Sequence, residues 1–453
     1  MATKRYEIDM SRGSIFKNLI KFAIPLMITS IIQLLYNAAD IVVVGRWSGA
    51  TSLAAIGATA SLYALLVNVF LGLSVGVCVV VSKKYGAKDF EGVKTTSHTS
   101  VLLGIIIGII TMMVGVLFCR PLLVLMATPV EVIDLSVHYM RIIFLGMPAA
   151  MLYNFGAAVL RSVGDTKRPL YILTATGAIK VILNLLFVTV FDMGVTGVAT
   201  ATVIVNVLSA FAIMFSLVFS DAPYRITIKN LKLIKEETVE IIKIGLPAGL
   251  QSGLFSLSNM VIQSAVNSLG TAAIAGNSAA YNIECFIYAT MTSFYQGTLT
   301  SVSQNYGAKQ EKRIYKTVYT AIGCSTVTAV LLGVTSVMFA KPLLGIYITD
   351  SPDAIDFGVQ RMIIAHLPYF LVAIMEQLAG LLRGVGSSVL PAINVFLSTC
   401  VLRVLWVIYI FPLNPSFYTL YACYIPSWTL SIILHFTGFM VIKKKIMLRM
   451  YEQ

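Results

Sequence analysis

The stretch LRSVGDTKRP, residues 160–169, returns as LRGVGSSVLP at residues 382–391, 222 positions further along the chain. Three further pairs keep the same order and nearly the same spacing: YGAKD (85–89) with YGAKQ (306–310), RPLL (120–123) with KPLL (341–344), and AIPL (23–26) with GLPA (245–248). A shared apolar composition would make membrane segments look alike, but it would not repeat a Tyr-Gly-Ala-Lys loop. The pattern therefore predicts an internal duplication.

The composition around these motifs is that of a membrane protein. Of 453 residues, 58% are apolar and 12% are charged, against about 25% charged in a soluble domain. Apolar runs of about 20 residues are long enough to cross a hydrocarbon core about 30 Å thick. We expect an all-α polytopic membrane protein with twelve transmembrane helices, at approximately residues 16–44, 53–80, 97–118, 133–158, 170–191, 196–219, 241–267, 272–301, 317–339, 358–382, 390–411 and 420–442.

The duplication predicts how these helices are organised. Each repeat holds six helices, and an even number returns the chain to its starting side, so the two copies share one orientation. We expect an N-terminal six-helix bundle at residues 1–219, a cytoplasmic linker at 220–240 and a C-terminal six-helix bundle at 241–453. Two pseudo-symmetric bundles leave a central cleft that suits alternating access. Apolar residues between Ile226 and Ile234 predict a short linker helix lying in the membrane interface.

The distribution of charge predicts the topology. Most of the 33 Lys and Arg, with Lys4 and Arg5 among them, lie in loops and tails on the side of the N-terminus, and few, such as Arg46 and Arg120, lie on the other side. This bias places both termini in the cytoplasm. The N-terminus has no cleavable signal pattern. A nucleic-acid partner would need a basic face on a soluble domain, so the net charge of +13 does not indicate one.

Cofactor and enzyme motifs are missing from the sequence. The six cysteines and four histidines are scattered, without a CxxC or a Cys/His pair. There is no phosphate-binding loop, so ATP is not the direct energy source. GLSVG at residues 72–76 looks like a serine elbow but lies within a span and has no partnered His. We expect no metal, no cofactor beyond a coupling ion, and no enzymatic activity.

Charged residues inside the apolar spans are costly unless they are paired, hydrated or used. Asp40 interrupts residues 31–45, IIQLLYNAADIVVVG, and Lys180 interrupts residues 173–191 near their middle. Asn184 lies one helical turn beyond Lys180, and Thr202 lies at a similar depth. We expect these four residues to line one polar pocket for ion coupling. The alternative is that Asp40 is a helix-end residue paired with Arg46.

The second repeat has its own set of buried charges. Glu284, Glu376 and Arg403 all fall near mid-membrane by the same counting of residues. We expect them to meet, as a coupling site with one carboxylate in excess or as a fixed structural Arg–Glu clamp. Six tyrosines beside Asn, Gln or Met in the spans are candidates for a substrate cleft, although helix packing or an interfacial belt would also explain any one of them: Tyr36, Tyr63, Tyr153, Tyr281, Tyr288 and Tyr295.

The motifs resemble signatures of the multidrug and toxin extrusion (MATE) family of secondary transporters. They comprise NAADIVVVG at residues 37–45, the two YGAK loops and the two LRxVG stretches, and the likeness covers about residues 15–445. NIE at residues 282–284 and FYQ at residues 294–296 look closest to the bacterial branch. The resemblance implies a bacterial plasma membrane protein with two bundles around a V-shaped central cleft. It also implies export of organic, often cationic, drugs in exchange for H⁺ or Na⁺.

The resemblance assigns roles to individual residues. Asp40 matches the family's coupling aspartate, and Asn154, Lys180, Asn184 and Thr202 match its polar surroundings. Many relatives carry an acid where this chain has Asn184 and an Asn where it has Lys180. Phe255 stands where sodium-coupled members carry an acid, and Glu376 lies about one turn from another of their acids. An ammonium near Asp40 disfavours Na⁺ there, so we favour protons.

Other functions fit the sequence less well than antiport. A lipid-linked precursor flippase of the same superfamily is the nearest alternative, but it should have a strongly cationic cavity for pyrophosphate. The cations available to such a cavity are Arg141, Lys180, Arg361 and Arg403. A receptor would gain nothing from duplicated bundles with buried acids. We expect the partners to be small organic molecules and the lipid bilayer, and a single chain with two bundles needs no second copy.

Overall fold

The chain folds into helices that form two compact units. The computed structural model describes residues 6–126, 128–349 and 351–452, so Lys4 and Arg5 lie outside the described part. The first unit comprises Met1–Asp9 and Ile24–Gly249, and the second comprises Met10–Ala23 and Leu250–Gln453. The described residues form helices, turns and loops without a β-strand. The all-α class is therefore confirmed.

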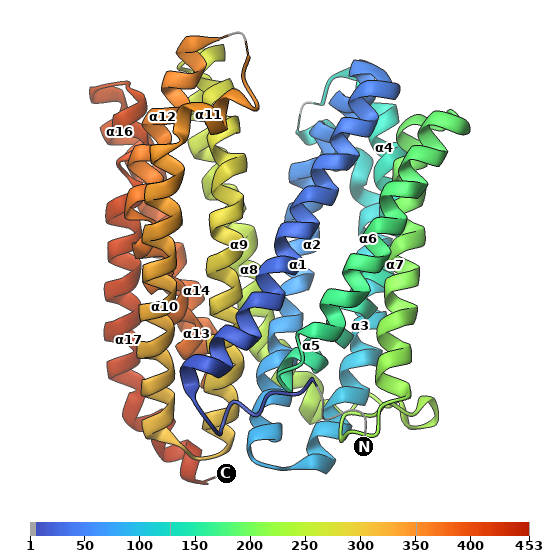
Figure 1. Cartoon of the computed structure of the whole chain (residues 1–453), viewed down its shortest axis with the longest axis vertical. Coiled ribbons are helices and arrows are strands. Elements are labelled where there is room, and N and C mark those ends of the chain that lie inside the picture. Colours follow the sequence, from blue (N-terminus) through green and yellow to red (C-terminus); the bar gives the residue numbers. More distant parts are fainter. Residues whose placement is uncertain (1–5, 127, 350, 453) are drawn as a thin grey trace. The chain divides into compact units, whose positions relative to one another are not determined.

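The first repeat contributes seven α-helices (Figure 1). They are α1 (Ile15–Trp47), α2 (Gly49–Gly86), α3 (Phe90–Leu125), α4 (Val130–Leu145), α5 (Met147–Ser162), α6 (Lys167–Leu185) and α7 (Gly194–Val218). A π-helical turn at Leu186–Val190 extends α6. The pair α4 and α5 is one span bent by 46° at Gly146.

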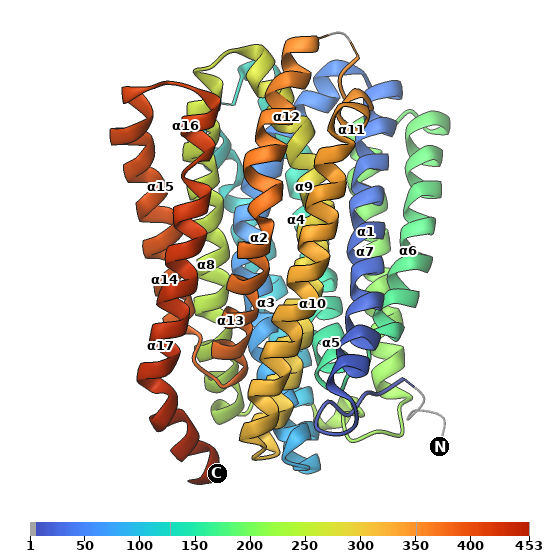
Figure 2. The ribbon, with the colours of Figure 1, turned by 60° about the vertical axis from the view of Figure 1, so that its left-hand side comes forward.

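The second repeat is more broken (Figure 2). Its long helices are α8 (Lys235–Asn267), α9 (Thr271–Gly307), α10 (Glu311–Met338) and α17 (Tyr424–Glu452). Shorter helices lie between α10 and α17: α11 (Ala340–Gly345), α12 (Pro352–His366), α13 (Phe370–Gly384), α14 (Val389–Val395), α15 (Leu402–Leu405) and α16 (Phe417–Tyr421). Single turns of 3₁₀- or π-helix join α12 to α13 and continue α14 and α15.

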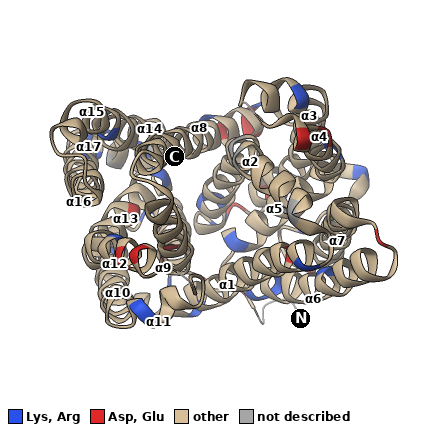
Figure 3. Ribbon diagram, turned by 90° about the horizontal axis from the view of Figure 1, so that it is seen from above, with Lys and Arg blue, Asp and Glu red and all other residues tan. Residues whose placement is uncertain are grey.

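Each of the twelve expected spans lies within one helix or one run of helical segments, except for a single residue at one end of three spans, and most of the helices extend several residues further. Among the described residues, nine helices are apolar enough to cross a membrane on composition alone, or ten with the bent pair counted as one span. The two that remain are α8 and α9, which are interrupted by polar side chains such as Gln251, Asn259 and Asn277. Figure 3 shows how few helical positions carry charge.

The duplication is visible in the backbone. Lys88 and Lys309, the lysines of the two YGAK loops, both have a positive φ, of 60° and 57°. Gly164 and Gly386, the matched glycines that end LRSVG and LRGVG, have φ values of 88° and 90°. Positive φ is uncommon for lysine, so its recurrence at matched positions indicates the same loop conformation in both repeats.

Hydrogen bonds are duplicated as well. In the first repeat the Ser82 hydroxyl donates to the Ser162 carbonyl over 3.1 Å. In the second repeat the Ser303 hydroxyl donates to the Gly384 carbonyl, also over 3.1 Å. The two donors lie 221 residues apart and the two acceptors 222, which matches the spacing of the sequence repeats. The internal duplication is confirmed.

Helices α1 and α8 each belong to both units. The start of α1 lies in the second unit, where Leu19 and Phe22 are buried beside Gly297. The start of α8 lies in the first unit, where a Cβ on Gly245 would lie 2.5 Å from the Leu73 Cα. The boundaries, at Ala23/Ile24 in α1 and Gly249/Leu250 in α8, do not follow the junction between the repeats.

The linker between the repeats differs from the prediction. Its expected interfacial helix is wrong, because the segment holds one 3₁₀ turn at Ile228–Asn230 between extended residues. Its backbone is bound to α3 instead: the Thr227 N–H donates to His98 Nε2 over 2.9 Å, and Thr99 donates to the Lys232 carbonyl over 3.2 Å. Ile226 is fully buried. These contacts satisfy backbone groups that a helix would have satisfied internally.

Candidate functional site

A close approach of α1 and α6 positions Asp40. Gly177 on α6 leaves room for the Tyr36 ring, since a Cβ there would lie 1.7 Å from Tyr36 Cε2. The Tyr36 hydroxyl donates to the Thr174 carbonyl over 3.1 Å. Asp40 follows Tyr36 by one helical turn, and Lys180 follows Gly177 by nearly one turn, so the next pair of side chains along these helices also meets.

Asp40 is held by two donors from α6. Its Oδ2 lies 2.6 Å from Lys180 Nζ, and its Oδ1 accepts a hydrogen bond of 2.5 Å from Asn184 Nδ2. The side chains of Asp40 and Lys180 are 16% and 13% exposed, while Asn184 is fully buried. A pair this well shielded interacts more strongly than a surface pair, and removing one partner leaves a costly unpaired charge. Asp40 is therefore paired with Lys180 and not with Arg46.

Two further residues of the predicted pocket make local hydrogen bonds. Asn154 Nδ2 donates to the Ala150 carbonyl of its own helix over 2.8 Å. The Thr202 hydroxyl donates to the Val198 carbonyl, one turn back in α7, over 2.9 Å. The structure thus brings Asp40, Lys180 and Asn184 into direct contact, and it leaves Asn154 and Thr202 bonded within their helices.

Sequence reasoning missed Tyr139 of α4. Its hydroxyl interacts electrostatically with Asp40 and with Tyr63 of α2. The Tyr63 ring also packs against Phe144 at a centroid distance of 6.4 Å. Tyr139 lies inside an ordinary apolar span, and nothing in its spacing distinguishes it from a packing residue.

In the second unit, Glu284 is paired with Arg361. Glu284 Oε2 accepts from Arg361 Nη2 over 2.6 Å, and the two side chains are 12% and 4% exposed. The expected meeting of Glu284, Glu376 and Arg403 does not occur. The reason is a close contact of α9 with α12: a Cβ on Gly276 would lie 2.2 Å from the Ala354 carbonyl oxygen.

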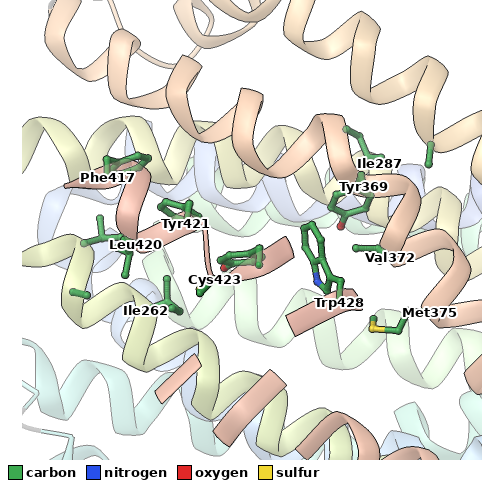
Figure 4. Packing of buried hydrophobic residues seen from close by; sticks show 14 of the residues in the cluster. Ile262, Ile287, Tyr369, Val372, Met375, Phe417, Leu420, Tyr421, Cys423 and Trp428 are labelled. Atoms are coloured by element: carbon green, nitrogen blue, oxygen red, sulfur yellow. The ribbon is translucent and has the colours of Figure 1, made fainter. Parts of the chain in front are cut away.

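Arg361 is also bound by Asn277. Its Nη1 donates to Asn277 Oδ1 over 2.5 Å and to the Asn277 carbonyl over 2.9 Å. The guanidinium lies 5.1 Å from the ring centroid of Tyr421, whose hydroxyl also bonds Asn277 Oδ1. Tyr421 belongs to a cluster of contacting aromatic rings with Phe417, Tyr424, Trp428 and Tyr369, part of which Figure 4 shows. This enclosed arrangement agrees with the structural clamp, one of the two interpretations of these charges.

Arg403 is fully buried and meets aromatic rings instead of a carboxylate. Its guanidinium lies 4.0 Å from the ring centroid of Tyr424 and 5.5 Å from that of Phe255. It donates to the Ser427 hydroxyl over 3.3 Å and to Asn259 Oδ1 over 3.4 Å. Cation–π contacts of this kind stabilise a desolvated arginine.

Glu376 of α13 lies in a different neighbourhood, where it interacts electrostatically with Arg383 and with Tyr288 of α9. Arg383 itself donates to the Tyr295 hydroxyl over 2.6 Å and to Gln251 Oε1 over 2.5 Å. Glu284 and Glu376 thus interact with different cations, Arg361 and Arg383, while Tyr369 interacts electrostatically with both acids.

The six candidate tyrosines are distributed over both units. Tyr153 and Tyr295 are buried, whereas Tyr281 and Tyr288 are 50% and 41% exposed. The Tyr153 hydroxyl donates to the Pro169 carbonyl over 3.4 Å, which indicates packing. Tyr281 lies beside Arg361, with 5.3 Å between its ring centroid and the guanidinium. Tyr36 lies one helical turn before Asp40, and Tyr63 interacts electrostatically with Tyr139.

Comparison with known proteins decides the family. The model of the MatE family matches residues 25–186 and again residues 247–408, so the second match begins 222 residues after the first. The chain belongs to the MATE family of multidrug efflux transporters. These proteins are transporters rather than enzymes, and the two matches coincide with the two halves of the duplication described above.

Individual relatives of this MATE protein agree in length. "Probable multidrug resistance protein YoeA" of Bacillus subtilis is 26% identical over 390 residues, 84% of each chain. "Multidrug export protein MepA" of Staphylococcus aureus is 25% identical over 380 residues, 83% of each chain. A solved structure described as the outward-facing conformation of a multidrug resistance MATE family transporter covers both chains fully, with 21% identity and a TM-score of 0.88. The predicted twelve-helix fold is confirmed.

Proposed function

We propose that this MATE protein is a proton-coupled antiporter that exports amphipathic, often cationic, organic molecules. The observation that carries the proposal is the shielded Asp40–Lys180 ion pair with Asn184 as a third member. A proton that binds Asp40 removes the charge that holds Lys180, so protonation and rearrangement of this site are linked. A cationic substrate that approaches the carboxylate competes with the same lysine.

Protons are favoured over sodium ions by the charges present. At the first site an ammonium lies 2.6 Å from the carboxylate, where a bound Na⁺ would meet a like charge. In the second unit, Phe255 and the permanently charged Arg403 lie together. A guanidinium in that position opposes Na⁺ in the same way.

The flippase alternative is less well supported. A pyrophosphate group requires unpaired cations, yet Lys180 and Arg361 are each paired with a carboxylate at 2.6 Å. Arg403 is enclosed by aromatic rings. For the same family reasons, we propose that the protein acts in a bacterial plasma membrane with both termini in the cytoplasm. We also propose that it transports as a monomer without a cofactor, since the candidate site lies within one unit.

The test is transport of a fluorescent organic cation in proteoliposomes, with a pH gradient and a Na⁺ gradient imposed separately. We expect the pH gradient alone to drive transport, and Asp40→Asn to reduce it by about tenfold or more, because the variant cannot exchange a proton. Lys180→Met should also lose gradient dependence. Transport driven by Na⁺ and unchanged in Asp40→Asn would refute the proposal.

A matched control is available on the surface of the same unit. Arg120 and Asp134 form an ion pair of 3.0 Å whose side chains are 56% and 78% exposed. Asp134→Asn removes the same charge from a solvated pair, which contributes about 0–1 kcal/mol. We expect it to leave transport unchanged. Thermal unfolding of each variant in detergent shows whether a loss of transport reflects a loss of fold.

A further inference from the structure

One face of α17 carries apolar side chains first and basic side chains towards the C-terminal end of the helix. Ile433, Phe436 and Met440 succeed one another at intervals of three and four residues, and each is more than half exposed. This spacing places them on one side of the helix. Further along the same face come Lys444 and Leu448. An apolar stripe therefore runs directly into a charged end.

The charged end carries four basic residues within seven positions: Lys443, Lys444, Lys445 and Arg449. Lys443 lies over the Tyr315 ring of α10, with 4.7 Å from its Nζ to the ring centroid. Lys444, Lys445 and Arg449 are exposed. Lys309 Nζ donates to the Tyr451 carbonyl over 3.4 Å, which ties the last turn of α17 to the second YGAK loop.

Two adjoining hollows lie among these side chains. One, of about 380 Å³, is lined by Val441, Lys444, Lys445, Leu448 and Arg449, so every charged group in its wall is basic. The other, of about 370 Å³, shares Lys444 and Leu448 and reaches α10 at Glu311. Val441 and Leu448 are 82% and 56% exposed. Cationic side chains thus lie beside exposed apolar ones in a shallow, open depression on the surface of α17.

The fold itself does not require this cluster. In the first repeat, α7 occupies the place of α17 and ends at Val218. The spacing of 222 places Asp221, Ala222 and Pro223 opposite Lys443, Lys444 and Lys445. The helix ends are equivalent by duplication, but only the second one carries a row of lysines.

We propose that the hollow at Lys444, Lys445 and Arg449 binds the phosphate headgroup of an anionic phospholipid whose acyl chains lie along Met440, Phe436 and Ile433. Basic clusters beside a membrane helix attract anionic lipids, with about 1 kcal/mol from each Lys or Arg near the surface. The apolar stripe distinguishes a lipid from a free anion, because only a lipid contacts both parts.

The test uses Leu448→Trp as a fluorescent reporter in the hollow of the full-length protein. The protein is reconstituted in vesicles that contain either brominated phosphatidylglycerol or brominated phosphatidylcholine at equal bromine content. We expect phosphatidylglycerol to quench the reporter at about fivefold lower mole fraction. Changing Lys444, Lys445 and Arg449 to Gln should abolish the preference, whereas Lys444→Arg with Lys445→Arg should keep it. Equal quenching by both lipids would refute the proposal.

Two controls separate this site from general effects of charge. Because basic residues also set topology, Met440→Glu provides a variant that keeps every Lys and Arg and places an acid beside the hollow. This variant should lose the preference for phosphatidylglycerol over phosphatidylcholine, while its topology stays unchanged. Neutralising Lys229, Lys232 and Lys235 of the other unit should keep the preference. If inorganic phosphate abolishes it at the concentration of the lipid headgroups, the site binds free phosphate and the proposal fails.

Discussion

Asn184 has a side-chain oxygen that is buried and has no hydrogen-bond partner, although its amide nitrogen is bound to Asp40. An amide that rotates by half a turn exchanges its donor for its acceptor. Asn184 can therefore donate to Asp40 as a carboxylate and accept from it as a carboxylic acid. An ionised Asp at this position could not donate a hydrogen bond to the Asp40 carboxylate, so the amide suits a carboxyl group that changes its protonation state.

The contact of Tyr36 with Gly177 gives a prediction for this site. Gly177→Ala would place a methyl group within 1.7 Å of the ring, so Tyr36 must move and separate α1 from α6 next to Asp40. Overpacking of this kind costs about 1–3 kcal/mol. We expect a lower unfolding temperature and slower transport. Gly57→Ala, where the added methyl meets nothing within 4 Å, should have neither effect.

Tyr36→Ala in the Gly177→Ala background supplies the complementary measurement. The smaller side chain removes the clash, so the double variant should recover most of the stability lost by Gly177→Ala. A double variant that is less stable than either single one would show that the clash is not the cause.

At the scale of helices, α9 and α12 are joined by glycines and by one ion pair. Gly276 allows the backbones to touch, and Glu284 and Arg361 then meet about two turns further along. Asn277 and Tyr421 complete the enclosure. This arrangement agrees with the structural clamp that was one of the two interpretations of the acids in the second repeat.

The clamp predicts strong coupling between its two charges. Arg361→Met leaves Glu284 buried without its cation, which should cost about 3–5 kcal/mol of the free energy of unfolding. Arg361→Met combined with Glu284→Leu removes both charges and should recover a large part of that loss. Thermal unfolding of the four forms in detergent measures the cycle. Transport retained by the stable double variant would confirm a structural role, and its loss would assign the pair to coupling.

At the scale of the whole molecule, the two units share α1 and α8. Pro25 and Pro247, which are 222 residues apart, lie within three residues of the boundaries in these helices. A proline removes one hydrogen bond from the helix interior and lowers its resistance to bending. Any rearrangement of one unit against the other must deform both shared helices, and each has its weakest point near its boundary.

Replacing both prolines therefore should stiffen the connections. In Pro25→Ala with Pro247→Ala, each helix regains a backbone hydrogen bond, so we expect equal or higher thermal stability together with slower transport at unchanged substrate affinity. Pro352→Ala is the control, because Pro352 lies at the first position of α12, where no such bond is lost. Faster transport in the double variant would contradict this interpretation.

The sequence predicted some of these features well and others not at all. The twelve spans and the duplication follow from apolar runs and repeated motifs, and the Asp40–Lys180–Asn184 contact follows from counting depth along neighbouring spans. Arg361 was not assigned to Glu284. The apolar run of its span begins at about residue 358, so Arg361 lies close to the start of that run. The helix begins earlier, at Pro352, with Ser351 as its cap, so Arg361 lies more than two turns inside.

The linker and the shared helices were beyond sequence reasoning for a related reason. The hydrogen bond from the Thr227 N–H to His98 joins segments 129 residues apart, and no local pattern records a partner at that distance. Burial also raises the pKa of Tyr224 to about 12, with a further increase from Glu7. The contact between Tyr224 and Glu7 depends on the N-terminal segment, whose position follows from tertiary packing alone.

The N-terminal segment also has a consequence for how the protein is made. The Met10 N–H donates to Gln304 Oε1 over 2.8 Å, and Arg313 donates to the carbonyls of Arg12 and Gly13, each over 2.9 Å. Met10 is translated 294 residues before Gln304, an interval of about 15–60 s at ordinary rates of synthesis. Met10 is thus translated long before the residue to which it donates. A nascent chain that stalls before α9 leaves Leu19 and Phe22 without the Gly297 surface against which they are buried, so the start of α1 stays exposed until α9 is made.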